Sequence, residues 1–86
     1  MLSLLYTPAF IRSLGKLPSA LQEEALEKIE LFRNTRNHSS LRAHKLTGRL
    51  QGRYSFSVNY RYRIIFTYEK KSIAILHTIG DHSIYE

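Results

Sequence analysis

The chain has 86 residues, enough for one small domain, and we therefore treat residues 1–86 as a single domain. It contains no cysteine, so disulfides, thiolate zinc sites and cysteine nucleophiles are excluded. No apolar run approaches the roughly 20 residues that a membrane-spanning helix needs. The first residues, M-L-S-L-L-Y, lack the basic flank of a signal peptide, and we expect a cytoplasmic protein.

Basic residues are concentrated in the middle of the chain. The net charge is +6, and no acidic residue occurs between Glu30 and Glu69. That stretch contains a series of basic side chains: Arg33, Arg36, Arg42, Lys45, Arg49, Arg53, Arg61 and Arg63. The positive electrostatic potential of such a basic stretch favours a polyanionic partner. A basic solvated surface would need no partner, but arginines placed next to tyrosines along strands favour a nucleic acid.

The N-terminal residues predict a strand followed by a short helix. Residues 2–6 are mostly apolar and suit a first strand. Thr7 can cap the next helix, with Pro8 at its first position, where the missing N–H costs nothing. Gly15 is a natural stop for this helix.

A second, longer helix is predicted to open at Ser19 and to end near Asn34 or Asn37. Ser19 and Gln22 have the spacing of a capping box. An apolar stripe at helical spacing would face the core, formed by Leu21, Ala25, Ile29 and Phe32. The two helices would form a hairpin that covers one side of a sheet.

Alternating side chains after residue 52 predict a β-hairpin with two unlike faces. Successive strand residues point to opposite faces, so aromatic and aliphatic side chains would share one face, and arginines and serines the other. A turn around residues 58–60 would pair Ser57 with Arg61 and Ser55 with Arg63. A one-residue slip would bury the arginines, which favours this register.

Residues 72–79 predict a final strand that is apolar on both faces. His77 lies inside it and is expected to be a packed, hydrogen-bonded side chain. The element order is then β-α-α-β-β-β, which makes the fold class α+β: a helical hairpin packed on a largely antiparallel sheet.

Three motifs make the whole chain resemble the RelE/ParE superfamily of toxins from bacterial and archaeal type II toxin–antitoxin systems. They are H-K-L-T-G-R-L-Q-G-R-Y-S-F-S-V from residue 44, Y-R-I-I-F from residue 62, and the ending I-G-D-H-S-I-Y. The H-x-L-x-G start and the G-x-H ending look most like the YafQ branch. The resemblance implies a RelE-like fold and cleavage of messenger RNA in the ribosomal decoding site, with neutralisation by an antitoxin that wraps around the toxin.

The resemblance also implies a set of catalytic residues. His44 matches the histidine of H-x-L-x-G, which the YafQ branch uses in cleavage, and Arg63 matches the arginine that RelE-type toxins place near the scissile phosphate. His82 matches the histidine near the YafQ C-terminus, and Tyr85 matches the terminal tyrosine of RelE types. The chain departs from RelE at Ser55 and Ser57, where RelE has two lysines. It departs from YafQ at residues 58–60, where YafQ has a further histidine and an aspartate.

These residue types suit metal-independent RNA cleavage, which needs a base for the ribose 2′-OH, a group that stabilises the phosphate and an acid for the leaving 5′-oxygen. Imidazole has an unperturbed pKa of about 6.5 and can fill both proton roles, so we expect His44 and His82 to share them. Arginine is always charged and can bond two phosphate oxygens, a role for Arg63 with Arg53. Tyr85 would stack on or orient a base.

The remaining basic residues are expected to bind RNA backbone: Lys45, Arg49, Arg53 and Arg61. We expect no metal site, because the four histidines contain no i, i+4 pair and only one aspartate accompanies them. We also expect no small-molecule cofactor. The expected partners are a cognate antitoxin, the ribosome and mRNA, with no membrane.

Three other functions remain open at this stage. A ParE-like toxin would inhibit DNA gyrase and cut no RNA, although that branch lacks the C-terminal histidine that His82 matches. A catalytically degenerate member would keep only antitoxin binding. An RNA-binding module without toxin activity would use the cationic sheet face alone.

Overall fold

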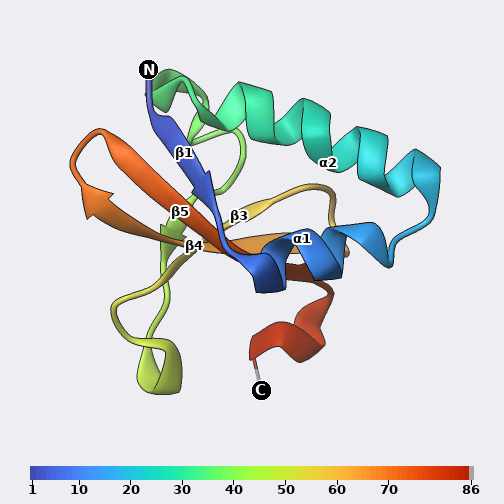
Figure 1. Ribbon diagram of the computed structural model, residues 1–86. Helices are drawn as coiled ribbons and strands as arrows, with labels where there is room; N and C mark the ends of the chain where they lie inside the picture. The colour runs from blue at the N-terminus through green and yellow to red at the C-terminus, as the bar shows by residue number, and fades with distance from the viewer. Residues whose placement is uncertain (86) are drawn as a thin grey trace.

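The computed structural model describes residues 1–85 and confirms the α+β class. Two helices pack on one five-stranded mixed sheet with strand order β1-β5-β4-β3-β2 (Figure 1). The strands are β1 (Ser3–Tyr6), β2 (His44–Lys45), β3 (Tyr54–Ser57), β4 (Arg63–Lys70) and β5 (Ile73–Gly80). The helices are α1 (Pro8–Gly15) and α2 (Ser19–Phe32), with short 3-10 turns at η1 (Thr35–Asn37), η2 (Gly48–Leu50) and η3 (His82–Tyr85).

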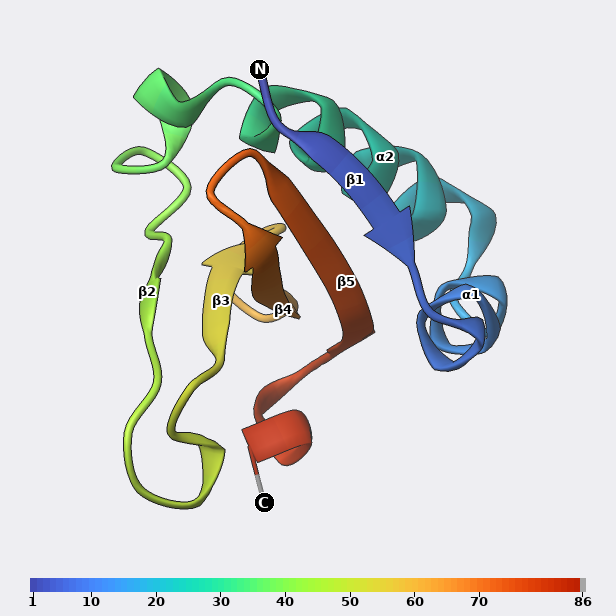
Figure 2. The same cartoon turned by 60° about the vertical axis from the view of Figure 1, so that its left-hand side comes forward.

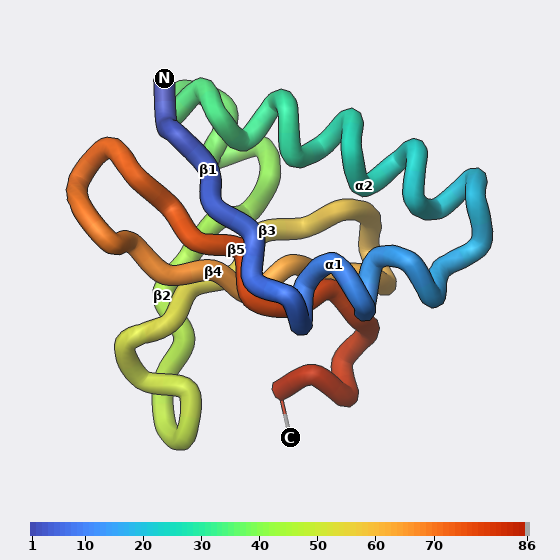
Figure 3. Tube along the Cα trace, in the orientation of Figure 1, coloured from blue at the N-terminus to red at the C-terminus, as the bar shows by residue number. Residues whose placement is uncertain are grey.

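The sheet is antiparallel except at one edge. β1 runs parallel to β5, and the other neighbouring strands pair antiparallel. β1 and β5 lie side by side although they come from opposite ends of the chain, and β1 and η3 lie towards opposite ends of the molecule (Figure 3).

Both helices begin where the sequence predicts, α1 after Thr7 and α2 at Ser19, but α2 ends at Phe32 and lacks the predicted cap. Thr7 caps α1, because its Oγ1 accepts a hydrogen bond of 3.0 Å from the Phe10 N–H. The capping box predicted for Ser19 and Gln22 is wrong, because Pro18 occupies the cap position and Ser19 is already helical. The Gln22 amide instead donates to the Leu17 carbonyl at 2.8 Å.

α1 and α2 both lie against one face of the sheet, and among residues 1–85 the other face carries no α-helix (Figure 2). The predicted stripe of α2 is confirmed, since Ala25, Ile29 and Phe32 are buried. The ring of Phe32 stacks on Phe56 at 4.1 Å and meets Phe66 edge-on at 4.6 Å. Stacked and edge-to-face aromatic pairs add roughly 0.5–1.5 kcal/mol each beyond the apolar area that they bury.

The hairpin between β3 and β4 has the expected faces but not the expected register. Ser57 pairs with Arg63 and Ser55 with Ile65, so the predicted pairs are displaced by two residues. The cause is Asn59, whose Oδ1 accepts hydrogen bonds from the backbone N–H groups of Arg61 and Tyr62. These hydrogen bonds lengthen the turn to residues 58–62. A shift of two residues keeps each side chain on its face, so Arg63 still lies on the serine side.

The C-terminal half contains one strand that was not predicted and one histidine that behaves as predicted. β2 is a two-residue strand that the sequence pattern does not reveal, and it pairs His44 with Ser55. His77 is hydrogen-bonded as expected, with its Nε2 at 2.8 Å from the Thr67 hydroxyl. The β2–β3 connection and η3 lie at the same end of the molecule (Figures 1 and 2).

Candidate active site

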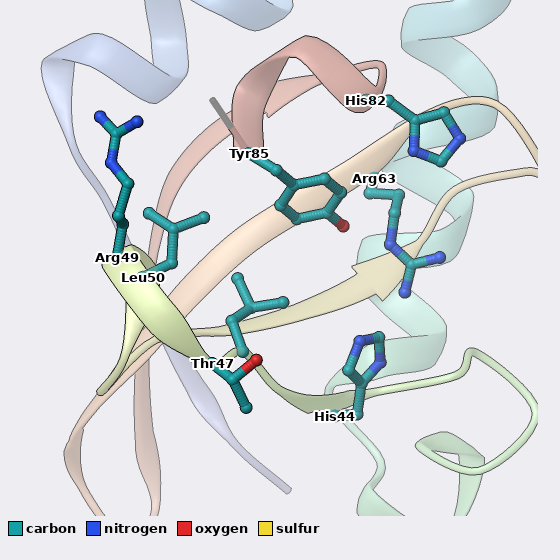
Figure 4. Close-up of a pocket in the computed structure, with 8 residues that line it drawn as sticks. His44, Thr47, Arg49, Leu50, Arg63, His82 and Tyr85 are labelled. Carbon is teal, nitrogen blue, oxygen red and sulfur yellow. The ribbon is translucent and has the colours of Figure 1, made fainter.

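A cavity of about 460 Å³ opens between the β2–β3 connection, the start of β4 and η3. Its lining residues are His44, Leu46, Thr47, Arg49, Leu50, Arg63, His82 and Tyr85. The four residues expected to be catalytic therefore come from three separate elements to one cavity: His44 on β2, Arg63 on β4, and His82 and Tyr85 on η3. Figure 4 shows the Arg63 guanidinium reaching between the histidine rings, with Tyr85 directed towards it.

Arg63 is held by three acceptors on the open face of the sheet. Its Nη1 donates to the Ser57 hydroxyl at 2.8 Å and its Nε to the Ser55 hydroxyl at 3.3 Å. Its Nη2 donates to the backbone carbonyl of Arg42 at 3.3 Å. The guanidinium has five N–H donors, so donors remain for an anion in the cavity while these three contacts keep the fork in place.

Ser55 also holds Tyr85. This serine is fully buried, and its Oγ accepts a hydrogen bond of 3.1 Å from the Tyr85 hydroxyl. One serine therefore contacts both the arginine and the tyrosine of the cavity, which ties η3 to the centre of the sheet.

The turn η3 has its own local supports. The Asp81 carboxylate accepts a hydrogen bond of 3.0 Å from the Ser83 backbone N–H. That hydrogen bond holds the pKa of Asp81 below its usual value, with smaller contributions from the charges of Arg61 and His82. Ile84 packs on Gly80, where a Cβ would overlap its side chain. Gly80 therefore provides the space in which η3 folds back towards Ser55.

The two histidines face the cavity from opposite sides. His44 is exposed, and its Nδ1 lies 2.8 Å from the Arg42 carbonyl oxygen. His82 is also exposed, and its ring centre lies 6.3 Å from that of Tyr85. Both imidazoles are open to a ligand in the cavity.

One of the four basic residues expected to bind RNA lines the cavity itself. Arg49 lines it, and Lys45 lines a neighbouring groove beside Tyr54. Arg53 and Arg61 do not line the cavity. Arg61 lies in the β3–β4 turn, with its guanidinium carbon 5.7 Å from the centre of the Tyr62 ring.

Arg53 lies near His77 of β5 rather than in the cavity lining. Burial lowers the pKa of His77 below its usual value, and the charge of Arg53 lowers it further. Arg53 therefore lies close enough to β5 to act on His77 through its charge.

Sequence reasoning missed the supports of the site. The sequence places Ser55 and Ser57 on the arginine face of the hairpin and shows them as departures from RelE, but hydrogen bonds from Arg63 to their hydroxyls were not predicted, and Arg42 was not singled out. A signal for the serines was present, because polar side chains on the arginine face of a strand are natural acceptors for a guanidinium. No such signal exists for a backbone carbonyl such as that of Arg42.

The residues that the structure describes contain neither a metal-binding cluster nor a membrane-spanning helix. Within residues 1–85, no group of three or more His, Cys, Asp or Glu side chains is placed to hold a metal ion. In the same residues, no helix has both the length and the apolar composition needed to cross a membrane.

Comparison with known proteins identifies the fold and the family. The archaeal RelE–RelB complex from Pyrococcus horikoshii matches with a TM-score of 0.71 and 18% identity over 93% of each chain. The RelBE2 toxin–antitoxin complex from Mycobacterium tuberculosis matches with a TM-score of 0.69 and 18% identity, over 94% of this chain and 98% of that one. YafQ from Escherichia coli matches with a TM-score of 0.70 and 10% identity, over 99% of this chain and 98% of that one.

No curated protein matches the sequence. Residues 12–81 match the family model described as HigB-like toxin, the RelE-like toxin of the type II toxin–antitoxin system HigB. This match covers most of the chain and confirms the RelE/ParE resemblance, while the branch it names is HigB-like. The chain therefore belongs to the HigB-like family of RelE-like toxins of type II toxin–antitoxin systems.

Proposed function

We propose that this toxin is an endoribonuclease that cuts mRNA on the ribosome and so inhibits translation. The observation that carries the proposal is the single cavity that collects His44, Arg63, His82 and Tyr85 from three elements. Two imidazoles on either side of a guanidinium supply the minimum set for cleavage of RNA by its own 2′-OH.

The reaction that suits these groups breaks one P–O bond and forms another. The ribose 2′-oxygen attacks the adjacent phosphorus as its proton passes to one imidazole, and the 5′-oxygen leaves with a proton from the other. The products are a 2′,3′-cyclic phosphate and a 5′-hydroxyl. The unused donors of Arg63 would bond the phosphate oxygens while charge develops on them.

The surrounding residues would bind and orient the RNA. The Tyr85 ring, fixed through its hydroxyl to Ser55, would stack on or orient a base. Arg49 in the cavity lining, Lys45 in the neighbouring groove, and Arg53 and Arg61 outside the lining would contact backbone phosphates. The proposed place of action is the cytoplasm, where the ribosome would present the mRNA.

The proposed protein partner is a cognate antitoxin. The RelBE2 and Pyrococcus horikoshii structures that share this fold are toxin–antitoxin complexes. A net charge of +6 favours an acidic antitoxin segment laid over the basic face.

The test is cleavage of mRNA on programmed ribosomes, with the new 5′ ends mapped by primer extension. The wild-type toxin is compared with His82→Ala, and with Tyr60→Phe as a matched control, because Tyr60 is 93% exposed and does not line the cavity. Loss of a general acid or base typically slows a reaction about 10²- to 10⁴-fold. We expect that loss in His82→Ala and none in the control.

Each other result has a distinct meaning. Cuts that persist in His82→Ala would move its proton role to another group, with His44→Ala tested next. No cuts by the wild type, beside an active control toxin, would reject the nuclease proposal and leave an antitoxin-binding protein or a gyrase inhibitor. A gyrase inhibitor would induce a DNA-damage response without mRNA cuts.

A further inference from the structure

Arg42 has a backbone conformation that stands apart from the rest of the chain. Its φ is 56°, and it is the only non-glycine residue within 1–85 that has a positive φ. A residue with a Cβ rarely adopts this left-handed conformation. It persists here because the neighbours on both sides are anchored: the Ser57 N–H donates to the Leu41 carbonyl at 2.8 Å, and the Ala43 N–H to the His38 carbonyl at 2.9 Å.

The consequence of this conformation is the direction of the Arg42 carbonyl. Its oxygen accepts from the Arg63 Nη2 at 3.3 Å and lies 2.8 Å from the Nδ1 of His44. A carbonyl oxygen can only accept a hydrogen bond, so the Nδ1 of His44 must carry a hydrogen in both the neutral and the charged ring. The proton that His44 gains and loses is therefore the one at Nε2.

We propose that Arg42 is a positioning residue, whose left-handed backbone holds His44 as the Nδ1–H tautomer and fixes the Arg63 guanidinium through the same carbonyl oxygen. The effect on cleavage rests on the proposed function, whereas the effect on the tautomer does not. One main-chain atom thereby sets both the reactive nitrogen of the histidine and the direction of the arginine fork. The Arg42 side chain takes no part in this role.

The test separates the backbone of Arg42 from its side chain. Arg42→Asn and Arg42→Val both remove the charge, but asparagine tolerates the left-handed conformation, whereas a β-branched residue is strongly disfavoured there. The tautomer of His44 is read from the ¹⁵N shifts of its two ring nitrogens in the full-length protein, at a pH where imidazole is neutral. Cleavage on programmed ribosomes is measured in parallel under single-turnover conditions.

We expect the Nδ1–H tautomer in the wild type and in Arg42→Asn, and a mixed or reversed tautomer in Arg42→Val. The cleavage rate should fall in Arg42→Val by about 10- to 100-fold relative to Arg42→Asn, since misplacement of a reacting group by about 1 Å can cost that much. If Arg42→Val fails to fold, Arg42→Ala against Arg42→Gly makes the same comparison with less strain.

The proposal is overturned by an Nε2–H tautomer in the wild type. It is also overturned if the asparagine and valine variants share the wild-type tautomer. Complete absence of nuclease activity would reject the proposed function, but the nitrogen shifts would still decide whether Arg42 sets the tautomer.

Discussion

Ser57 shows how a residue without reactive chemistry can contribute to the site. Its hydroxyl accepts the shortest of the three hydrogen bonds that hold Arg63, at 2.8 Å. We predict that Ser57→Ala lowers the rate of mRNA cleavage about tenfold or more, because the guanidinium loses an anchor and a misplacement of about 1 Å is costly. Single-turnover cleavage on ribosomes measures this loss.

The matched control for Ser57 is Ser57→Thr, which keeps the hydroxyl on a residue suited to a strand. It should retain most of the activity. A Ser57→Ala toxin as fast as the wild type would show that Ser57 does not position Arg63.

His77 should make the stability of the protein depend on pH. Burial and the charge of Arg53 lower its pKa in the folded state below the value of about 6.5 expected in the unfolded chain. On acidification below that value the unfolded state takes up the proton first, so this contribution to the free energy of unfolding falls as pH drops and levels off below the folded pKa. Above about pH 6.5 it should be flat.

NMR titration of His77 provides the measurement. Its midpoint should lie below that of a model histidine and should rise in Arg53→Gln. Denaturant unfolding at several pH values should show a weaker loss of stability on acidification in His77→Gln than in the wild type. A normal midpoint that is unaffected by Arg53→Gln would contradict this explanation.

At the scale of elements, the placement of η3 depends on the absence of a side chain at Gly80. A methyl group there would overlap Ile84 and push η3, with His82 and Tyr85, away from Ser55. We predict that Gly80→Ala reduces cleavage at least tenfold, because both side chains move from the cavity. The combined variant Gly80→Ala with Ile84→Ala restores the space and should recover part of the activity.

Gly15→Ala is the control, since a Cβ there meets no atom within 4 Å and the residue lies in α1. It should leave cleavage unchanged. Equal losses in Gly15→Ala and Gly80→Ala would remove the argument for a specific contact with Ile84.

The β3–β4 turn is organised by Asn59, which links it to α2. Its Oδ1 accepts from the Tyr62 N–H at 2.7 Å, and its Nδ2 donates to the Glu24 carboxylate at 2.7 Å. We predict that Asn59→Ala lowers the free energy of unfolding by about 1–3 kcal/mol, the usual cost of such lost hydrogen bonds. Denaturant titration measures the loss.

Asn59→Asp keeps the acceptor for the turn but loses the donor to Glu24 and adds a like charge. It should therefore also destabilise the protein, and more strongly at neutral pH than in acid. Unchanged stability in both variants would show that the longer turn has another cause.

At the scale of the whole molecule, the order of the elements could be predicted from the sequence, but the register of the β3–β4 hairpin could not. The element order and the two faces of the hairpin follow from side-chain periodicity, and the cap at Thr7 follows from local chemistry. The register could not be predicted, because it depends on the hydrogen bonds of one side chain, Asn59, with the backbone and with a distant helix. β2 is too short to carry a periodic pattern.

The site was predictable only in its reactive groups. The family resemblance selected His44, Arg63, His82 and Tyr85, which line one cavity, although their roles stay a prediction. Their supports depend on tertiary contacts: a buried serine between two elements, and a carbonyl turned by a left-handed residue. Arg53, expected to act on the phosphate with Arg63, and Arg61, expected to bind RNA backbone, lie outside the cavity lining.

The central claim is that this cavity cleaves mRNA through the ribose 2′-OH. The most direct test is an mRNA with a single 2′-deoxynucleotide on the 5′ side of the mapped cut, presented on programmed ribosomes to the wild-type toxin. The expected result is loss of that cut, with cleavage retained at other sites of the same message. Unchanged cutting at the 2′-deoxy position would contradict the claim, because no oxygen would be present there to attack the phosphate.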